Sequence, residues 1–458
     1  MNFAIVGGGI TGLIAAKILN DKYPNSNITL IEKANEMGGI LAGTYYKKQG
    51  IYFDKGTHIF RETGYPQIDD FILSSIPKTE LIHFDVHQGD IAGAVFDGKL
   101  QSNSHFPDIR KLTNYDDLYI SLSNQVNSCN PISPIERLEP LITNACSRFG
   151  ELYTKKVLAP ILSNLFQRPA EDLASFSLLL PGLTRIVCSN YLEWLQNAHN
   201  IQYREIFAVP DQRKLPNQLR HGKRSFYSHS LGSRNFVKGI TANLESKGVQ
   251  FLQSTTITSF NLDKLLITCL TPKGESLELQ VDGIVLATGV FGAAQLLDIS
   301  MEIFSFDQPI LSRIINLIVK KSPESDLCYF YGLDPKMDFY RVTNYRAFSG
   351  NPKDRRLSIE VLGNNAIDNS ILPQHVLKQL FDIGFISHEG FEFGDVVRLK
   401  TGFPTPTISN MQSLVKLSDY VHEQLPNKVL LGGIGAKKGL FFQNEIIKDI
   451  SDKILERF

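Results

Sequence analysis

Cysteine is scarce in this chain, and its spacing excludes several kinds of site. Only five cysteines occur among 458 residues, and no two of them form a C-x-x-C pair. A zinc ribbon and a dithiol redox motif both need such pairs, so neither is encoded here. An odd, sparse set of thiols suits a reducing compartment, and we therefore predict a cytoplasmic protein. The cysteines are Cys129, Cys146, Cys188, Cys269 and Cys328.

Net charge and long apolar runs are also missing. Lysine plus arginine number 47, as do aspartate plus glutamate, so no net positive charge is available for holding nucleic acid. No stretch approaches the roughly 18–20 uncharged apolar residues that span a membrane. No basic residues precede the first apolar run, which argues against a secretory signal. We predict neither a nucleic-acid partner nor a transmembrane segment.

The motifs of several enzyme classes are absent as well. The sequence contains no G-x-S-x-G elbow, no H-E-x-x-H pair and no Walker loop. Its ten histidines are scattered, so we predict no metal site. Any chemistry must therefore come from a different kind of site.

The first residues of the chain carry a clear motif. Phe3 to Val6 form a short apolar run typical of a buried parallel strand, and Gly7-Gly8-Gly9-Ile10-Thr11-Gly12 then fits G-x-G-x-x-G. A helical apolar pattern follows, and the run from Asn27 to Glu32 predicts a second strand. Strand, glycine turn, helix and acidic residue together indicate a dinucleotide-binding unit rather than a structural turn.

Each part of this motif has a physical role. Gly7 permits a tight turn, Gly9 lets the backbone approach a pyrophosphate, and Gly12 lets the helix pack against the sheet. The helix N-terminus offers free N–H groups and the positive end of a dipole to the phosphates. Glu32 can accept hydrogen bonds from ribose hydroxyls, and its charge would repel a 2′-phosphate. We expect Lys33 beside it to belong to the same cofactor site.

The next segment resembles a known superfamily. Gly38-Gly39 follows the acidic residue, and the run from Gly50 to Phe60 contains Asp-Lys-Gly-Thr-His. This pattern is similar to that of the flavoproteins that include protoporphyrinogen oxidase, monoamine oxidase and UDP-galactopyranose mutase. The resemblance implies FAD, with its adenosine on Glu32 and its diphosphate and flavin against Gly38 and Gly39. The oxidases usually have Arg after this glycine pair, whereas this chain has Ile40. The mutases also lack that Arg, so the difference weakens the resemblance to amine oxidases but not the expectation of a flavin.

Two residues of this segment have alternative interpretations. His58 is either a proton relay beside the flavin or a loop histidine whose ring is bound by backbone. We interpret Asp54 as a structural turn residue rather than a catalytic acid.

The resemblance also predicts how the chain is divided. In the superfamily, later segments return to the cofactor domain: a strand near Val249 contacts the adenine end, and a strand ending at Ala287-Thr288-Gly289 approaches the diphosphate. The strand that leads into Gly432-Gly433 and the following helix bind the diphosphate and ribityl chain. We therefore expect an α/β protein with a discontinuous Rossmann-type FAD-binding domain and an inserted α+β substrate domain. The FAD-binding domain would contain residues 1–65, 222–300 and 405–458, and the substrate domain residues 66–221 and 301–404.

The predicted substrate domain contains long helical patterns over residues 134–197 and a second sheet. Strands are expected from Arg313 to Lys320 and from Leu357 to Leu362. Between them lies Tyr340-Arg341, where the mutases carry a Tyr-x-Arg stretch with the Arg near the substrate diphosphate. Arg341 is thus either a substrate ligand or a solvated strand residue. The mutases also have an Arg and tyrosines after the last glycine pair, and this chain has Ile434 instead of that Arg.

These observations favour an FAD-dependent oxidoreductase that oxidises a small organic substrate by hydride transfer to the flavin. The alternatives are a nucleotide-sugar mutase-like isomerase that uses reduced FAD, and a non-catalytic protein that binds a flavin or another dinucleotide. The partner that we expect is a small-molecule substrate, and a homo-oligomer remains open.

Overall fold

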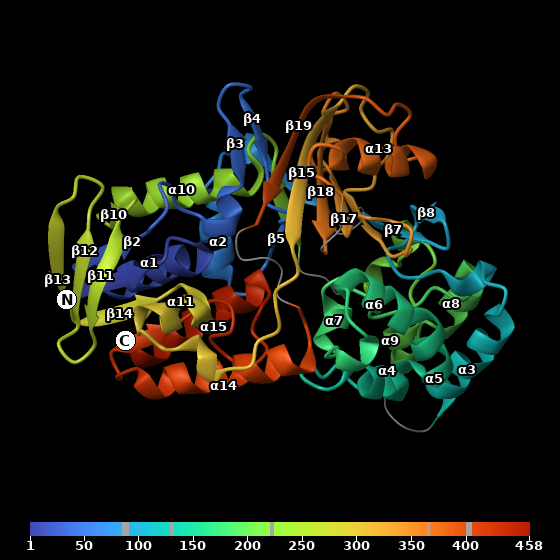
Figure 1. The fold of residues 1–458 in the computed structure, drawn as a ribbon, viewed down its shortest axis with the longest axis horizontal. Coiled ribbons are helices and arrows are strands. Elements are labelled where there is room, and N and C mark those ends of the chain that lie inside the picture. Colours follow the sequence, from blue (N-terminus) through green and yellow to red (C-terminus); the bar gives the residue numbers. More distant parts are fainter. Residues whose placement is uncertain (85–90, 129–131, 220–223, 364–366, 400–404) are drawn as a thin grey trace. The chain divides into compact units, whose positions relative to one another are not determined.

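Two compact units make up the chain. The computed structural model describes residues 1–84, 91–128, 132–219, 224–363, 367–399 and 405–458 (Figure 1). The first unit contains Met1–His83, Lys223–Ser305 and Ser413–Phe458, and the second contains Phe84–Gly222 and Phe306–Gln412. Both units are discontinuous in sequence. This division differs from the expected one mainly at residues 66–83, 301–305 and 405–412. Residues 66–83 join the first unit because helix α2 (Pro66–Ser74) packs Ile68, Phe71 and Ile72 into its core.

A five-stranded parallel sheet organises the first unit. Its strand order is β10-β2-β1-β14-β20, and every neighbouring pair is parallel. The strands are almost continuously apolar because both faces are covered, as in α/β folds generally. Their bounds are Asn2–Val6 for β1, Asn27–Ile31 for β2, Gln250–Leu252 for β10, Gly283–Leu286 for β14 and Val429–Leu431 for β20.

Helices from distant parts of the sequence pack on this sheet. Helix α1 (Ile10–Lys22) contacts α15 (Gln443–Arg457), and α10 (Gly232–Ser246) packs on both α1 and α2. One apolar core joins these helices to the strands, with Leu13 and Ile14 from α1 and Ile447 and Ile450 from α15 at its centre. The unit also contains α11 (Gly289–Leu296), and α14 (Ile408–Gln424) crosses the division between the units.

Smaller sheets complete the first unit. Strands β11 (Thr256–Asn261), β12 (Leu266–Leu270) and β13 (Ser276–Gln280) form an antiparallel sheet beside the parallel one (Figure 1). The remaining short strands form a hairpin and a three-stranded sheet of order β5-β9-β6. Their bounds are Thr44–Tyr46 for β3, Ile51–Phe53 for β4, Phe60–Arg61 for β5, Leu81–Phe84 for β6 and Ser225–Ser228 for β9.

The second unit is built around a seven-stranded mixed sheet of order β19-β15-β18-β17-β16-β7-β8. All its neighbouring pairs are antiparallel except β16 and β7. The Asp97-Gly98 turn joins β7 and β8, with positive φ at both residues, as the sequence pattern predicts. The bounds are Ala92–Phe96 for β7, Lys99–Gln101 for β8, Ser312–Val319 for β15, Tyr329–Gly332 for β16, Arg341–Asn344 for β17, Arg356–Leu362 for β18 and Phe391–Arg398 for β19.

Two sets of helices belong to the second unit. Helix α13 (Leu372–Asp382) packs Val376 and Leu380 onto the apolar face of the sheet, over Ile315 and Leu317. Figure 1 shows a helical group that lies between β8 and β9 in the sequence. This group has its own apolar core, in which Trp194 is 1% exposed. Its members are α3 (Tyr115–Asn127), α4 (Leu141–Phe149), α5 (Glu151–Tyr153), a π-helical turn (Thr154–Leu158), α6 (Ala159–Phe166), α7 (Phe176–Leu179), α8 (Tyr191–Asn197) and α9 (Ile201–Ile206); α12 (Tyr345–Ser349) follows β17.

Candidate functional site

The carboxyl edge of the parallel sheet gathers most of the predicted cofactor residues. Because all five strands run in the same direction, the segments that follow them lie along one edge of the sheet. These segments begin with Gly7 after β1, Glu32 after β2, Ala287 after β14 and Gly432 after β20. The edge therefore brings together residues that are more than 400 positions apart in the sequence.

The turn between β1 and α1 is held by backbone hydrogen bonds. Gly7 has a φ of 106°, which glycine tolerates, and its N–H donates to Ile31 O at 2.9 Å. Gly38 N donates to Gly8 O at 2.7 Å, so the second glycine pair lies beside the first. A Cβ on Gly12 would lie well inside contact distance of Gly7 O. The close approach of helix and turn therefore depends on glycine at position 12.

Gly9 and Gly39 border space that no described side chain fills. A Cβ built on Gly9 meets nothing within 4 Å, and one on Gly39 meets only Gly9 Cα at 3.5 Å. Gly9 is also the N-cap of α1, and no side chain caps that helix end. The first N–H groups of α1 are thus available beside an open approach, which suits a phosphate group. The residues present therefore fit the pyrophosphate of a dinucleotide.

Glu32 has a structural role that the sequence did not reveal. Its Oε2 accepts a hydrogen bond from Gly8 N at 2.6 Å, and its Oε1 accepts one from Ala34 N at 2.7 Å. The carboxylate thus holds the glycine turn and the loop after β2 together. Each oxygen keeps a further lone pair, so acceptance from ribose hydroxyls stays compatible with this arrangement.

The other half of the edge is also lined by backbone. Gly289 N donates to Gly432 O at 3.1 Å, and Ala287 N donates to Val6 O at 2.8 Å. A Cβ on Gly433 would lie 2.8 Å from Gly289 N, so the two turns pack directly on each other. The glycines at these positions let two chain segments meet without side chains between them.

Asp54 lies at the centre of a buried polar network in the first unit. The residue is 2% exposed, and its Oδ1 accepts hydrogen bonds from Tyr52 Oη at 2.6 Å and from Ser233 N at 3.2 Å. Its Oδ2 accepts a hydrogen bond from Tyr227 Oη. The network links β4, β9 and the start of α10. This arrangement agrees with the interpretation of Asp54 as a structural residue.

Three further predicted residues lie in different surroundings. His58 is half-buried, and its Nε2 lies 3.0 Å from Lys55 O, as a loop histidine bound by backbone would be. Lys33 is exposed at the sheet edge. Val249 does not lie at this edge: it precedes β10 at the opposite end of the sheet, and its side chain is buried in the core at 4% exposure.

The correction for Val249 follows from strand direction. Leu252 O, at the carboxyl end of β10, accepts a hydrogen bond from Glu32 N, and Thr255 N donates to Glu32 O at 3.0 Å. The end of β10 at Leu252 and the segment that follows it, rather than Val249, therefore lie beside Glu32. Thr255, which the sequence motifs did not single out, therefore lies at the carboxyl edge of the sheet, as the parallel direction of the strand requires.

The mixed sheet of the second unit places charged groups on the face opposite α13. Arg341 Nε lies 2.7 Å from Glu360 Oε1, and Arg341 Nη2 lies 3.0 Å from Glu360 Oε2. The rings of Tyr331 and Tyr340 lie beside the guanidinium. Burial opposes its charge, yet Glu360 holds the pKa of Arg341 well above its usual value. Glu360 thus already balances the charge of Arg341.

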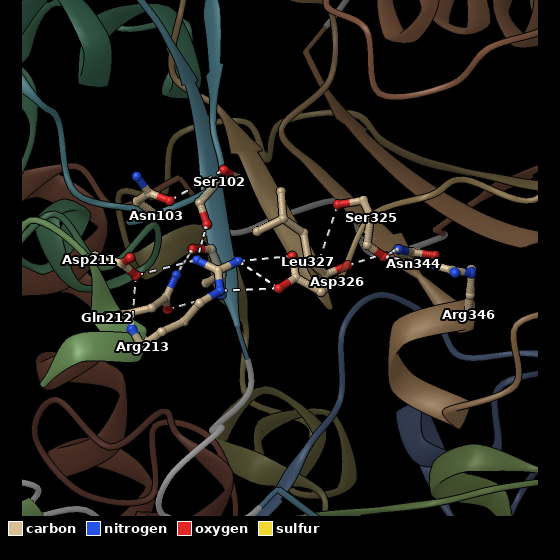
Figure 2. A network of polar contacts seen from close by, with 11 residues as sticks. Ser102, Asn103, Asp211, Gln212, Arg213, Ser325, Asp326, Leu327, Asn344 and Arg346 are labelled. Atoms are coloured by element: carbon tan, nitrogen blue, oxygen red, sulfur yellow. Dashed lines mark hydrogen bonds and ion pairs between the residues drawn. The ribbon is translucent and has the colours of Figure 1, made fainter.

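A second polar network joins a loop to the edge of the same sheet. Figure 2 shows the Arg213 guanidinium facing Asp326, with Asp211 and Ser102 beside it. Gln212 pairs with both backbone groups of Ala92, accepting from its N–H at 3.2 Å and donating to its carbonyl oxygen at 2.7 Å. These contacts fix the residues 211–213 against the start of β7. We assign them a structural role.

The described residues contain neither a cluster of metal-binding side chains nor a membrane-spanning helix. No group of three or more His, Cys, Asp or Glu side chains in the described part of the chain is placed to hold a metal ion. Among the same residues, every helix is too short or too polar to cross a lipid bilayer.

Comparison with known proteins gives partial sequence matches. Residues 5–73 match the family model of the NAD(P)-binding Rossmann-like domain. The 4,4'-diapophytoene desaturase (4,4'-diaponeurosporene-forming) of Staphylococcus haemolyticus is 26% identical over 178 residues, which is 37% of this chain and 30% of the relative. Uncharacterized protein R188 of Acanthamoeba polyphaga mimivirus is 32% identical over 81 residues, which is 18% of this chain and 15% of that relative. The matches thus span less than a third of either relative.

Solved structures match the fold over the whole chain. Reduced UDP-galactopyranose mutase aligns with a TM-score of 0.70 and 16% identity, covering 99% of this chain and 94% of that one. A putative protoporphyrinogen oxidase from Exiguobacterium sp. 255-15 aligns with a TM-score of 0.65 and 17% identity, covering 99% and 98%. The predicted α/β class is confirmed, and so is the resemblance of the fold to these two proteins. The first unit thus has a Rossmann-type parallel sheet, and its residues 5–73 resemble a dinucleotide-binding domain.

Proposed function

We propose that the chain is an FAD-dependent oxidoreductase that oxidises a small organic substrate. The observation that carries this proposal is the open approach at the N-terminus of α1, where a Cβ on Gly9 would meet nothing within 4 Å and one on Gly39 would meet only Gly9 Cα. FAD supplies the hydride acceptor, so the protein needs no catalytic pair of its own.

Different residues of the sheet edge would bind different parts of the cofactor. The N–H groups at the start of α1 and the backbone of Gly9 bind the pyrophosphate, and Glu32 receives the ribose hydroxyls, with Lys33 beside it. Gly38 and Gly39 lie next to the same turn. Ala287 and Gly289 approach the diphosphate from the neighbouring strand, together with Gly432 and Gly433. On this proposal the first unit is the FAD-binding domain, and the second is the substrate domain.

The strongest alternative is a mutase-like isomerase that uses reduced FAD. The fold match to UDP-galactopyranose mutase and the Tyr340-Arg341 pair favour it. Glu360 weakens it, because a guanidinium that already holds a carboxylate bidentately has less charge to offer a substrate diphosphate. We therefore rank oxidation first.

The cofactor proposal is tested by adding FAD to the purified protein and measuring flavin absorbance after gel filtration. We expect a yellow protein, with flavin lost in Gly9→Val because the new side chain fills the phosphate approach. Glu32→Arg should also lose flavin, whereas Glu275→Arg, which makes the same charge change at an exposed turn, should keep it. A folded protein that takes up no FAD, or a Gly9→Val variant with normal occupancy, contradicts the proposal.

The reaction type is tested with the flavin-loaded protein. We expect an oxidisable amine, porphyrinogen or polyene to bleach the flavin without oxygen, and oxygen or another acceptor to restore its colour. Turnover of a sugar nucleotide by prereduced enzyme, with no net consumption of electrons, would instead establish the isomerase. Stable flavin with no turnover of any of these substrates would establish a non-catalytic binding protein.

A further inference from the structure

Arg313 is a buried arginine whose hydrogen-bonding capacity is only partly used. It lies in β15 and is 3% exposed. Its Nη1 donates to Ile367 O at 2.9 Å and lies 3.3 Å from Asn369 Oδ1. Its Nε and Nη2 are buried, and no partner for either occurs among the described residues. An unpaired buried N–H costs free energy because it has lost its water without gaining an acceptor.

Other arginines of the second unit show what the Nε and Nη2 groups, which form one edge of a guanidinium, normally bind. In Arg341 the Nε and Nη2 groups together hold Glu360. In Arg356 they hold Asp354, and in Arg213 they hold Asp326 (Figure 2). The two parallel N–H groups match the two oxygens of one carboxylate. Arg313 presents the same Nε and Nη2 groups, and no acid among the described residues is bound to them.

A second arginine lies directly opposite. Strand β19 pairs with β15 so that Arg398 is the register partner of Arg313, and both side chains therefore lie on the same face. Arg398 is exposed, and neither arginine makes an ion pair within the described ranges. Like charges in directly opposed positions destabilise a sheet. Two such groups together create a local excess of positive charge.

Two acidic residues that lie close in sequence to the groups around this pair make no ion pair with it. Asp368, next to Asn369, accepts hydrogen bonds from Ser370 N at 2.7 Å and from Ser370 Oγ at 2.6 Å. Asp395 lies three positions from Arg398 in β19, so the alternation of the strand places it on the opposite face. Burial lowers the pKa of Arg313, although the guanidinium keeps its charge at neutral pH.

We propose that Arg313 and Arg398 form a binding site for an oxyanion, a carboxylate or phosphate group, received on the Nε/Nη2 edge of Arg313. Asn369 and the carbonyl of Ile367 hold the other side of the guanidinium and so fix the direction of that edge. The residues of this site all belong to the second unit. It would suit an acidic group of a substrate or an effector.

The proposal is tested by thermal unfolding of the full chain in increasing sodium phosphate or sodium acetate, with sodium chloride at matched ionic strength as reference. We expect a saturable rise in Tm with phosphate, acetate or both, beyond that in chloride. The anion that gives the larger rise identifies the chemistry of the ligand.

Variants assign the effect to this site. Arg313→Lys keeps the charge but removes the two-donor edge, and should raise the half-saturating concentration by about tenfold or more. Arg398→Met, at an exposed position, should raise it by about threefold. The control Arg355→Met removes the same charge from a position where the guanidinium already holds Glu392, and should leave it unchanged.

Two results would overturn the proposal. One is the absence of any saturable rise with either anion. The other is a rise in Tm whose half-saturating anion concentration in both Arg313→Lys and Arg398→Met equals that of the wild type. A phosphate effect that disappears in Gly9→Val but not in these variants would place the anion at the turn before α1 instead. Because the Arg398 position is exposed, that variant remains informative even when a change at Arg313 impairs folding.

Discussion

The two candidate sites are built from different parts of the chain. Backbone turns form the one at the carboxyl edge of the parallel sheet in the first unit, whereas charged side chains form the one on the mixed sheet of the second unit. At the edge, glycines let backbone meet backbone, and the open approach at Gly9 exists because side chains are missing. On the mixed sheet, half-buried charged side chains such as those of Arg341 and Glu360 lie on one face of the strands. A substitution that adds a side chain to a packed glycine should therefore destabilise the first region, whereas one that removes a charged partner should destabilise the second.

The largest expected effect is at Gly12. In Gly12→Ala the new methyl group collides with Gly7 O, which is backbone and cannot move aside cheaply, so the free energy of unfolding should fall by about 3 kcal/mol or more. Urea denaturation measures this loss. Gly9→Ala is the matched control at the same turn, where the methyl group meets nothing, and its cost should stay below about 1 kcal/mol. Equal losses in the two variants would refute the separation of a packing glycine from an open one.

The corresponding change in the second unit removes a charge. Glu360→Ala leaves Arg341 mostly buried without its carboxylate and should lower the free energy of unfolding by about 3 kcal/mol. The double variant Arg341→Met/Glu360→Leu removes both charges and should recover most of that loss. If the single and double variants are equally unstable, packing rather than charge sets the cost.

A somewhat smaller effect is expected where the first unit does use a buried charge. Asp54→Asn replaces a carboxylate oxygen with a donor that faces the hydroxyls of Tyr52 or Tyr227, and should cost about 2 kcal/mol. Asp263→Asn makes the same change on an exposed hairpin and should be neutral. An Asp54→Asn variant as stable as the wild type would show that the network tolerates loss of its charge.

The smallest effect concerns a hydrogen bond between two helices of the second unit. Tyr119 Oη donates to Glu193 Oε1 at 2.5 Å, and this bond raises the pKa of Tyr119 to about 12. An unfolded tyrosine titrates near pH 10, so the contribution to stability is present below about pH 10 and is lost as the pH rises through about 12. A phenolate absorbance titration of the wild type minus Tyr119→Phe measures this pKa. A Tyr119 signal that titrates near pH 10 would contradict the assignment.

The two regions also differ in how far their sequence predicts them. The turn from Gly7 to Gly12 could be recognised because its glycines, strand and helix are contiguous and their spacing has one physical explanation. The same locality applies to the Asp97-Gly98 turn, where two adjacent residues with positive φ join β7 and β8. Val249 was misplaced because a likeness between strands does not say which end of the strand lies at the site.

Arg313 could not be recognised in advance as more than the start of an apolar strand. Its importance depends on Arg398, which is 85 positions away, and on which acids fail to reach it. Register and strand alternation bring these groups together, and neither is written in local spacing. The one available signal was a charged residue inside a run of buried apolar residues, and the same signal would also describe an ordinary ion pair such as that of Arg341.

The order of the parallel strands has a consequence for biosynthesis. Strand β20 and the buried face of α15 belong to the same sheet and core as β1, yet they follow the whole second unit in the sequence. While the ribosome is still translating residues 306–412, the growing polypeptide therefore lacks one border strand of this sheet and the turn at Gly432. Domains usually fold as they emerge from the ribosome, with the N-terminal one first. The first unit begins at the N-terminus, but its parallel sheet is complete only after β20 has been synthesised. On the proposed function, a dinucleotide that needs both turns would therefore bind only after the Gly432 turn has been synthesised.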